Sequence, residues 1–154
     1  MKVLRKNFQI YRSSAGSGKT YMLSVNFIKL SLQGYFNGDV KYYQKILAIT
    51  FTNKAASEMK DRIIYYLRCL SLGRDIDNVL DSITKDSSYQ NQSVFDAAKE
   101  IYSHIIHHYN KLSISTIDKF TTHLVRSFSK DLGLSYNFDL ELDKSKIMEP
   151  VIAL

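Results

Sequence analysis

Two patterns of apolar and polar positions alternate along the chain, and together they predict strands that are each followed by helices. Short apolar runs typical of strands occupy residues 8–11, 46–51 and 112–117. Longer stretches carry apolar residues at three- and four-residue intervals, as helices do; they are residues 21–34, 53–73, 75–84, 94–109 and 120–133. Because strands and helices alternate, the pattern predicts an α/β domain of three layers with a mostly parallel sheet.

The run at 46–51 is apolar at nearly every position, which is typical of a central parallel strand that is covered on both faces. The next helix is expected to begin at Asn53, whose side chain is a good N-cap, and to end at Gly73. Gly34 is expected to end the first helix in the same way.

A stretch rich in glycine and serine, followed by a lysine and a threonine, lies between the first predicted strand and the first predicted helix. It reads Ser13-Ser14-Ala15-Gly16-Ser17-Gly18-Lys19-Thr20. The two glycines allow a tight turn that brings several backbone N–H groups to one anion. Lys19 is placed to reach the β- and γ-phosphates, and the Thr20 hydroxyl to bind Mg²⁺. We therefore expect residues 14–20 to bind ATP and Mg²⁺, with Lys19 and Thr20 also serving catalysis.

This stretch fits the P-loop pattern G-x-x-x-x-G-K-[ST] except at its first position, where Ser13 replaces glycine. The alternative is a flexible loop of glycine and serine before an ordinary helix. Ligands of parallel sheets lie at the carboxyl ends of the strands. The predicted strands place three segments there: the phosphate loop, residues 50–53 and residues 116–118. We expect them to share one face.

Composition narrows the class of protein. The chain has 154 residues, which suits one domain, and a formal charge of +6, which modestly favours a polyanionic partner. A single cysteine, Cys69, excludes an internal disulfide and fits a cytoplasmic protein. No apolar run is long enough to span a membrane. The apolar residues 151–154 at the end predict that the chain is a fragment of a longer protein.

Residues 46–63 resemble motif Ia of the UvrD/Rep/RecB group of superfamily 1 DNA helicases. Residues 113–120 look like the next motif of that family, in which Thr-x-His-x-Phe is usual, but Asp118 stands in place of the histidine. Residues 131–138 resemble the linker that leaves the first motor domain. The helical insertion at about 65–111 is longer than in UvrD and Rep, and in this it is similar to RecB and AddA subunits of helicase–nuclease complexes.

The resemblance implies a P-loop, RecA-like fold and assigns roles to matching positions. Gly16, Gly18, Lys19 and Thr20 match the residues that bind the triphosphate. The positions that match contacts to single-stranded DNA are Thr50, Phe51, Thr52, Asn53 and, in the second motif, Thr116.

Residues 1–135 would form part of the first motor domain, and 136–154 would begin the next subdomain. The whole enzyme would be an ATP-dependent helicase in recombination or repair. Its partners would be single-stranded and double-stranded DNA and another subunit of a helicase–nuclease complex, with no membrane.

Several alternatives stay open. Because no Asp-Glu motif follows an apolar strand, the isolated chain is not expected to hydrolyse ATP efficiently. A phosphotransferase of the nucleoside kinase type or a nucleotide-sensing module would also use the phosphate loop. Phe51 would alternatively end a strand in the core, and Asp118 would stabilise the first turn of a helix. Glu100, His104 and His108 have a spacing that suits zinc, but a polar helix face is favoured.

Overall fold

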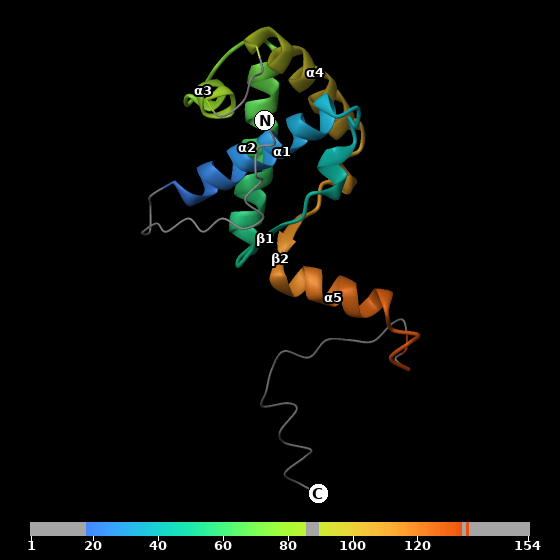
Figure 1. The fold of residues 1–154 in the computed structure, drawn as a ribbon. Helices are drawn as coiled ribbons and strands as arrows, with labels where there is room; N and C mark the ends of the chain where they lie inside the picture. The colour runs from blue at the N-terminus through green and yellow to red at the C-terminus, as the bar shows by residue number, and fades with distance from the viewer. Residues whose placement is uncertain (1–17, 86–89, 134, 136–154) are drawn as a thin grey trace, which may run out of the picture.

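In the part of the chain that the computed structural model describes, residues 18–85, 90–133 and 135, most of the fold is helical (Figure 1). The elements in order are α1 (Lys19–Phe36), the 3-10 helix η1 (Tyr42–Lys45), β1 (Ala48–Thr50), α2 (Asn53–Ser71), α3 (Val79–Thr84), α4 (Asn91–His107), the 3-10 helix η2 (Tyr109–Lys111), β2 (Ile114–Thr116) and α5 (Ile117–Ser127). The predicted strand at 8–11 and the predicted elements after residue 135 lie outside these residues. One short parallel sheet lies at one end of the helices α1, α2 and α4 (Figure 1).

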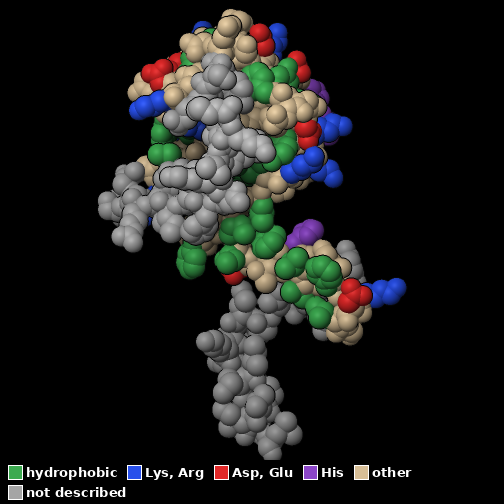
Figure 2. Space-filling model, viewed as in Figure 1, with side chains coloured by type: hydrophobic (Ala, Val, Ile, Leu, Met, Phe, Trp, Pro, Cys, Tyr) green, Lys and Arg blue, Asp and Glu red, His purple; other side chains and the backbone are tan. Residues whose placement is uncertain are grey.

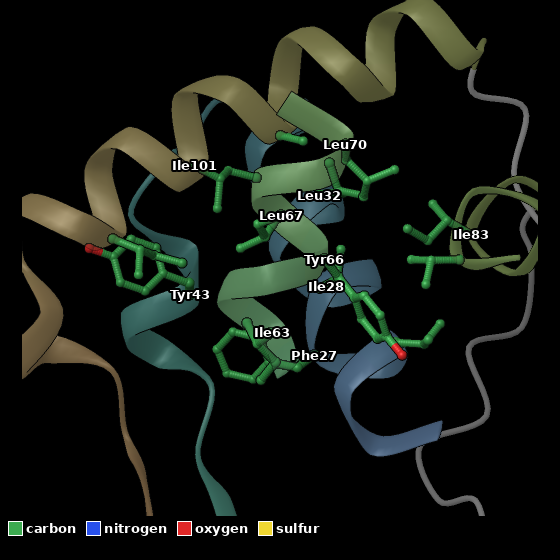
Figure 3. Packing of buried hydrophobic residues seen from close by; sticks show 14 of the residues in the cluster. Phe27, Ile28, Leu32, Tyr43, Ile63, Tyr66, Leu67, Leu70, Ile83 and Ile101 are labelled. Atoms are coloured by element: carbon green, nitrogen blue, oxygen red, sulfur yellow. The ribbon is translucent and has the colours of Figure 1, made fainter. Parts of the chain in front are cut away.

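Helix α2 stands at the centre of the fold, with α1 and α4 packed against it (Figure 1). Its apolar residues recur every three or four positions and therefore form one stripe, which is buried as the sequence predicts. The stripe consists of Ala56, Met59, Ile63, Leu67 and Leu70. Ile28 and Leu32 from α1 and Ile101 from α4 complete the same cluster (Figure 3). The core therefore lies between helices, and the expected insertion contributes α3 and α4 to it.

The two described strands, β1 and β2, pair in parallel, as predicted. Their register sets Ala48 beside Ile114, Ile49 beside Ser115 and Thr50 beside Thr116. A parallel pair needs a long crossover, which here is the helical segment from α2 to η2. The described fold is thus a mixed α/β structure with a small parallel sheet.

The strand predicted at 46–51 is shorter in the structure, and the prediction that both of its faces are covered does not hold among the described residues. Only Ala48–Thr50 form the strand, and the side chains of Leu47 and Ile49 are 47% and 42% exposed. In the described structure the strand therefore has one half-buried face, with Ala48 and Thr50, and one exposed face, with Ile49.

Two predicted helix boundaries are wrong. Gly34 lies buried within α1, where a Cβ would overlap the Tyr42 side chain, so glycine serves close packing there. The helix instead ends before a turn at Gly38, whose φ is 88°. The N-cap of α2 is Thr52, not Asn53, because the Thr52 hydroxyl accepts a hydrogen bond from the Ala55 amide. Gly73 ends this helix region as predicted, with a φ of 69°.

Helix α5 is strongly amphipathic, yet none of its residues is buried. It projects from the end of β2, and Figure 2 shows apolar side chains gathered on it. Ile117, Leu124 and Phe128 are each about half exposed. The described residues therefore leave the apolar stripe of α5 uncovered. None of the helices in the described part of the chain has the length and apolarity needed to span a bilayer.

Candidate nucleotide and nucleic-acid site

Helix α1 begins directly at the end of the predicted phosphate loop. Gly18 is its N-cap and has a left-handed backbone, with φ 81° and ψ 21°, which only glycine adopts without strain. Lys19 and Thr20 form the first turn, which contains no acidic residue. The positive end of the helix dipole therefore meets no carboxylate of its own first turn, and the arrangement fits an anion such as a phosphate. Residues 14–17 lie outside the described residues, so their role stays a prediction.

The carboxyl ends of the two strands bring the two predicted nucleic-acid motifs together. Thr50 and Thr116 are paired residues in the last register position of β1 and β2. Each strand then leads into a helix that a threonine caps: Thr52 caps α2, and Thr116 caps α5 by accepting a hydrogen bond from the Lys119 amide at 3.3 Å. Two helix N-termini thus begin at the same edge of the sheet, where they favour negative charge.

The hydroxyl of Thr50 holds the turn between β1 and α2. It donates a hydrogen bond to the Thr52 carbonyl oxygen at 3.0 Å, and the Ser115 carbonyl oxygen lies 3.5 Å away. Thr116 is only 5% exposed, so its side chain serves the cap of α5 from within the fold. A contact from either hydroxyl to DNA stays a prediction. The observed hydrogen bonds of Thr50 and Thr116 hold the backbone at this edge of the sheet in place.

Phe51 projects from this edge into solvent. Its side chain is 88% exposed, so the alternative that it ends a strand in the core does not hold. Thr52 and Asn53 beside it are exposed as well. An aromatic ring next to helix N-termini is suited to stack a nucleic-acid base while backbone N–H groups hold a phosphate.

Asp118 lies in the first turn of α5, at the same edge of the sheet. A carboxylate in the first turn interacts favourably with the helix dipole, so the helix-stabilising alternative fits this position. The same negative charge faces any phosphate that approaches the N-terminus of α5. The geometry is thus consistent with both roles that the sequence left open.

Thr52→Ala is expected to lower the free energy of unfolding by about 1 kcal/mol, because it removes the N-cap of the central helix. Urea unfolding followed by circular dichroism measures the change. Thr121→Ala is the matched control, since the Thr121 hydroxyl bonds the Ile117 carbonyl inside a helix and alanine favours helices. Equal losses in both variants would contradict the capping role.

The histidines at the C-terminal end of α4, and His108 at its C-cap, make structural contacts. The Nδ1 atom of His104 lies 3.1 Å from the Tyr43 hydroxyl, and the rings of His104 and His108 stack with their centroids 4.5 Å apart. Burial, together with the neighbouring His108, lowers the pKa of His104. Among the described residues no group of three or more His, Cys, Asp or Glu side chains is arranged to hold a metal ion.

A polar cluster beside the start of α1 is one that no pattern in the sequence predicts. The Tyr21 hydroxyl donates to the carbonyl oxygen of Asp77 at 2.9 Å, and the Tyr66 hydroxyl donates to the Asp77 carboxylate at 2.9 Å. Tyr21 is 56 positions from Asp77, and only the tertiary fold brings the two together. The cluster places the connection between α2 and α3 next to the residue that follows Thr20.

Comparison with known proteins finds relatives of one kind, the subunits of helicase–nuclease enzymes. An ATP-dependent helicase/nuclease protein of the AddA kind from Clostridioides difficile is 32% identical over 126 residues, which cover 82% of this chain and 8% of the relative. The RecB protein of the RecBCD enzyme from Borreliella burgdorferi is 29% identical over 130 residues, covering 82% of this chain and 9% of the relative. The ATP-dependent helicase/nuclease protein of the same kind from Bacillus cytotoxicus is 30% identical over 146 residues, covering 91% and 10%.

The chain thus spans a tenth or less of the length of these three relatives. No solved structure matches it significantly. The family model of the UvrD/REP helicase N-terminal domain matches residues 2–152, which is nearly the entire sequence. The chain therefore belongs to the UvrD/REP helicase N-terminal domain family, and its relatives are helicase/nuclease subunits of the RecB and AddA kind.

Proposed function

We propose that this chain is the ATP-binding part of an ATP-dependent DNA helicase that translocates on single-stranded DNA in recombination or repair. The observation that carries the proposal is the edge at Thr50 and Thr116, where two helix N-termini begin beside the exposed ring of Phe51. Family membership implies a P-loop, RecA-like fold. In such a fold the described strands would belong to a larger sheet at the centre of a three-layer domain. Subunits of a helicase–nuclease complex are the proposed partners.

The start of α1 would hold the triphosphate. The left-handed backbone of Gly18 turns the chain into the helix, and the N–H groups of the first turn point toward an anion at this end. The Lys19 ammonium would neutralise charge on the β- and γ-phosphates, and the Thr20 hydroxyl would bind Mg²⁺. Bound MgATP would supply the free energy of phosphoanhydride hydrolysis.

The edge at β1 and β2 would hold the DNA. N–H groups at the start of α2 would bind a backbone phosphate, because the first turn of this helix contains no acidic residue. Phe51 would stack a base without regard to its identity, as a motor that moves along any sequence requires. Thr50 would keep the turn in place through its bond to the Thr52 carbonyl.

Asp118→Asn is expected to strengthen binding of single-stranded DNA by about twofold to fivefold, because it removes a negative charge near the phosphates. Fluorescence anisotropy with a labelled oligonucleotide in low salt measures the affinity. The gain should shrink at higher ionic strength, since salt screens exposed charges. Asp96→Asn on α4 is the control and should leave the affinity unchanged. A weaker complex after Asp118→Asn would indicate a direct, favourable contact instead.

The proposal is tested by measuring ATP hydrolysis of the full-length protein with and without single-stranded DNA. Strong stimulation by DNA is the expected result. Hydrolysis or transfer that ignores DNA and depends on a nucleoside acceptor would favour a phosphotransferase. Nucleotide binding without turnover, together with no binding of DNA, would favour a sensing module.

A further inference from the structure

The residue that follows Thr20 connects the start of α1 to a distant turn. The Tyr21 hydroxyl donates to the Asp77 carbonyl oxygen at 2.9 Å and lies 3.2 Å from the Ser82 hydroxyl. Asp77 belongs to the connection between α2 and α3, and Ser82 belongs to α3. The first turn of the helix that carries Lys19 is thus tied to an element outside that helix.

A second tyrosine holds the same turn from the core side. Tyr66 is 2% exposed, and its hydroxyl donates to the Asp77 carboxylate at 2.9 Å. Its ring meets the ring of Tyr21 edge to face, with centroids 6.1 Å apart. Burial and the hydrogen bond to Asp77 raise the pKa of Tyr66 to about 12, which favours the protonated phenol that donates this bond.

The turn itself has a conformation that needs support. Asp77 and Asn78 both have a φ of 54°, in the left-handed region that residues other than glycine seldom occupy. Such a backbone persists where the surroundings hold it in place. Here the two tyrosine hydroxyls hold Asp77, and the Asp75 carboxylate accepts a bond from the Leu80 amide at 2.8 Å just beyond it.

We propose that Tyr21 is a positioning residue for the nucleotide, and that the turn at Asp77 and Asn78 is its anchor. The inference rests on the proposed function, because it takes the start of α1 as the phosphate site. Helix ends fray, and a frayed first turn would point its N–H groups away from a bound phosphate. The bond from Tyr21 to Asp77 opposes this fraying. The first turn is therefore already ordered before the nucleotide binds, and binding does not have to supply the free energy of ordering it.

Tyr21→Phe in the full-length protein tests the proposal, because it keeps the ring and removes only the hydroxyl. We expect the Kd for MgATP, measured by isothermal titration calorimetry, to rise about fivefold, the change that loss of one hydrogen bond gives. Tyr43→Phe is the matched control, since the buried Tyr43 bonds His104 and lies across the cluster from Tyr66, the tyrosine whose ring contacts Tyr21 (Figure 3). Both substitutions should lower Tm by a few degrees. Tyr43→Phe, however, should change the Kd for MgATP less than twofold.

Hydrogen exchange gives a readout that a purely structural role would not move. In the wild type, MgATP is expected to slow amide exchange at residues 77–84. This protection should persist in Tyr43→Phe and disappear in Tyr21→Phe. The proposal is overturned if Tyr21→Phe binds MgATP as tightly as Tyr43→Phe does. It is also overturned if MgATP leaves amide exchange at residues 77–84 unchanged in the wild type. If Tyr21→Phe does not fold, the exchange measurement on the wild type decides by itself.

Failure of the proposed function gives a different result. In that case the wild type would not bind MgATP, or Lys19→Ala would bind it as tightly as the wild type. Binding that depends on Lys19 but not on Tyr21 would retain the nucleotide site and reject the positioning role.

Discussion

Lys19→Ala in the full-length protein is expected to lower ATP turnover by about 10²–10³-fold, the loss typical when one charge-stabilising donor is removed from a reaction centre. Lys19 lies in the first turn of α1, one residue after the left-handed Gly18, and this turn contains no acidic residue. Phosphoryl transfer relies on such positive charge, because negative charge spreads over the transferred group. A steady-state ATPase assay with saturating single-stranded DNA measures the change.

Two controls make that result specific. Lys99→Ala removes an exposed lysine from α4 and should leave turnover unchanged. Thermal unfolding of both variants should match the wild type closely, because Lys19 is exposed and its truncation leaves no cavity. If Lys19→Ala kept more than half of the turnover, the start of α1 would not be the phosphate site.

Phe51→Ala is expected to weaken binding of single-stranded DNA by roughly 10-fold or more, since stacking of one base on an aromatic ring contributes about 1–3 kcal/mol. Its ring is 88% exposed, so truncation removes a binding surface without opening the core. The free energy of unfolding should therefore change by less than about 0.5 kcal/mol. Anisotropy titrations with a labelled oligonucleotide, beside urea unfolding, measure both quantities.

Phe51→Tyr should restore most of the affinity, because a phenol ring also stacks. Leu72→Ala serves as the control: its side chain is 61% exposed beyond the other end of α2, and its loss should not affect DNA binding. Comparable losses in Phe51→Ala and Leu72→Ala would show that the edge of the sheet has no special affinity for DNA.

The parts of the fold that follow from local periodicity were predictable. The stripe of α2 repeats every three or four residues, and this spacing alone places its apolar side chains on one face. Gly73 also follows from local chemistry, because a left-handed residue after a helix favours glycine. The parallel pairing of β1 and β2 follows from the alternation of strands with helices.

The predictions failed where tertiary contacts decide. Gly34 has the composition of a helix stop, but packing against Tyr42 makes it a close-approach residue inside the helix. Thr52 and Asn53 are both good caps, and the backbone geometry selects Thr52. Of the candidate site, the sequence indicated Lys19, Phe51 and the strand ends, whereas the link from Tyr21 to Asp77 joins positions that no local pattern relates.

The pairing of Thr50 with Thr116 has a consequence for how the chain folds. Thr50 and Ser115, which meet across the two strands, are separated by 65 positions, so their encounter closes a long loop of chain and carries a large entropic penalty. Helices α2 and α4 lie between these strands in the sequence, so their mutual contacts close shorter loops and are expected to form first. The pairing of β1 with β2 would then be among the last contacts to form, and mutations that weaken this pairing should accelerate unfolding while leaving the rate of folding nearly unchanged.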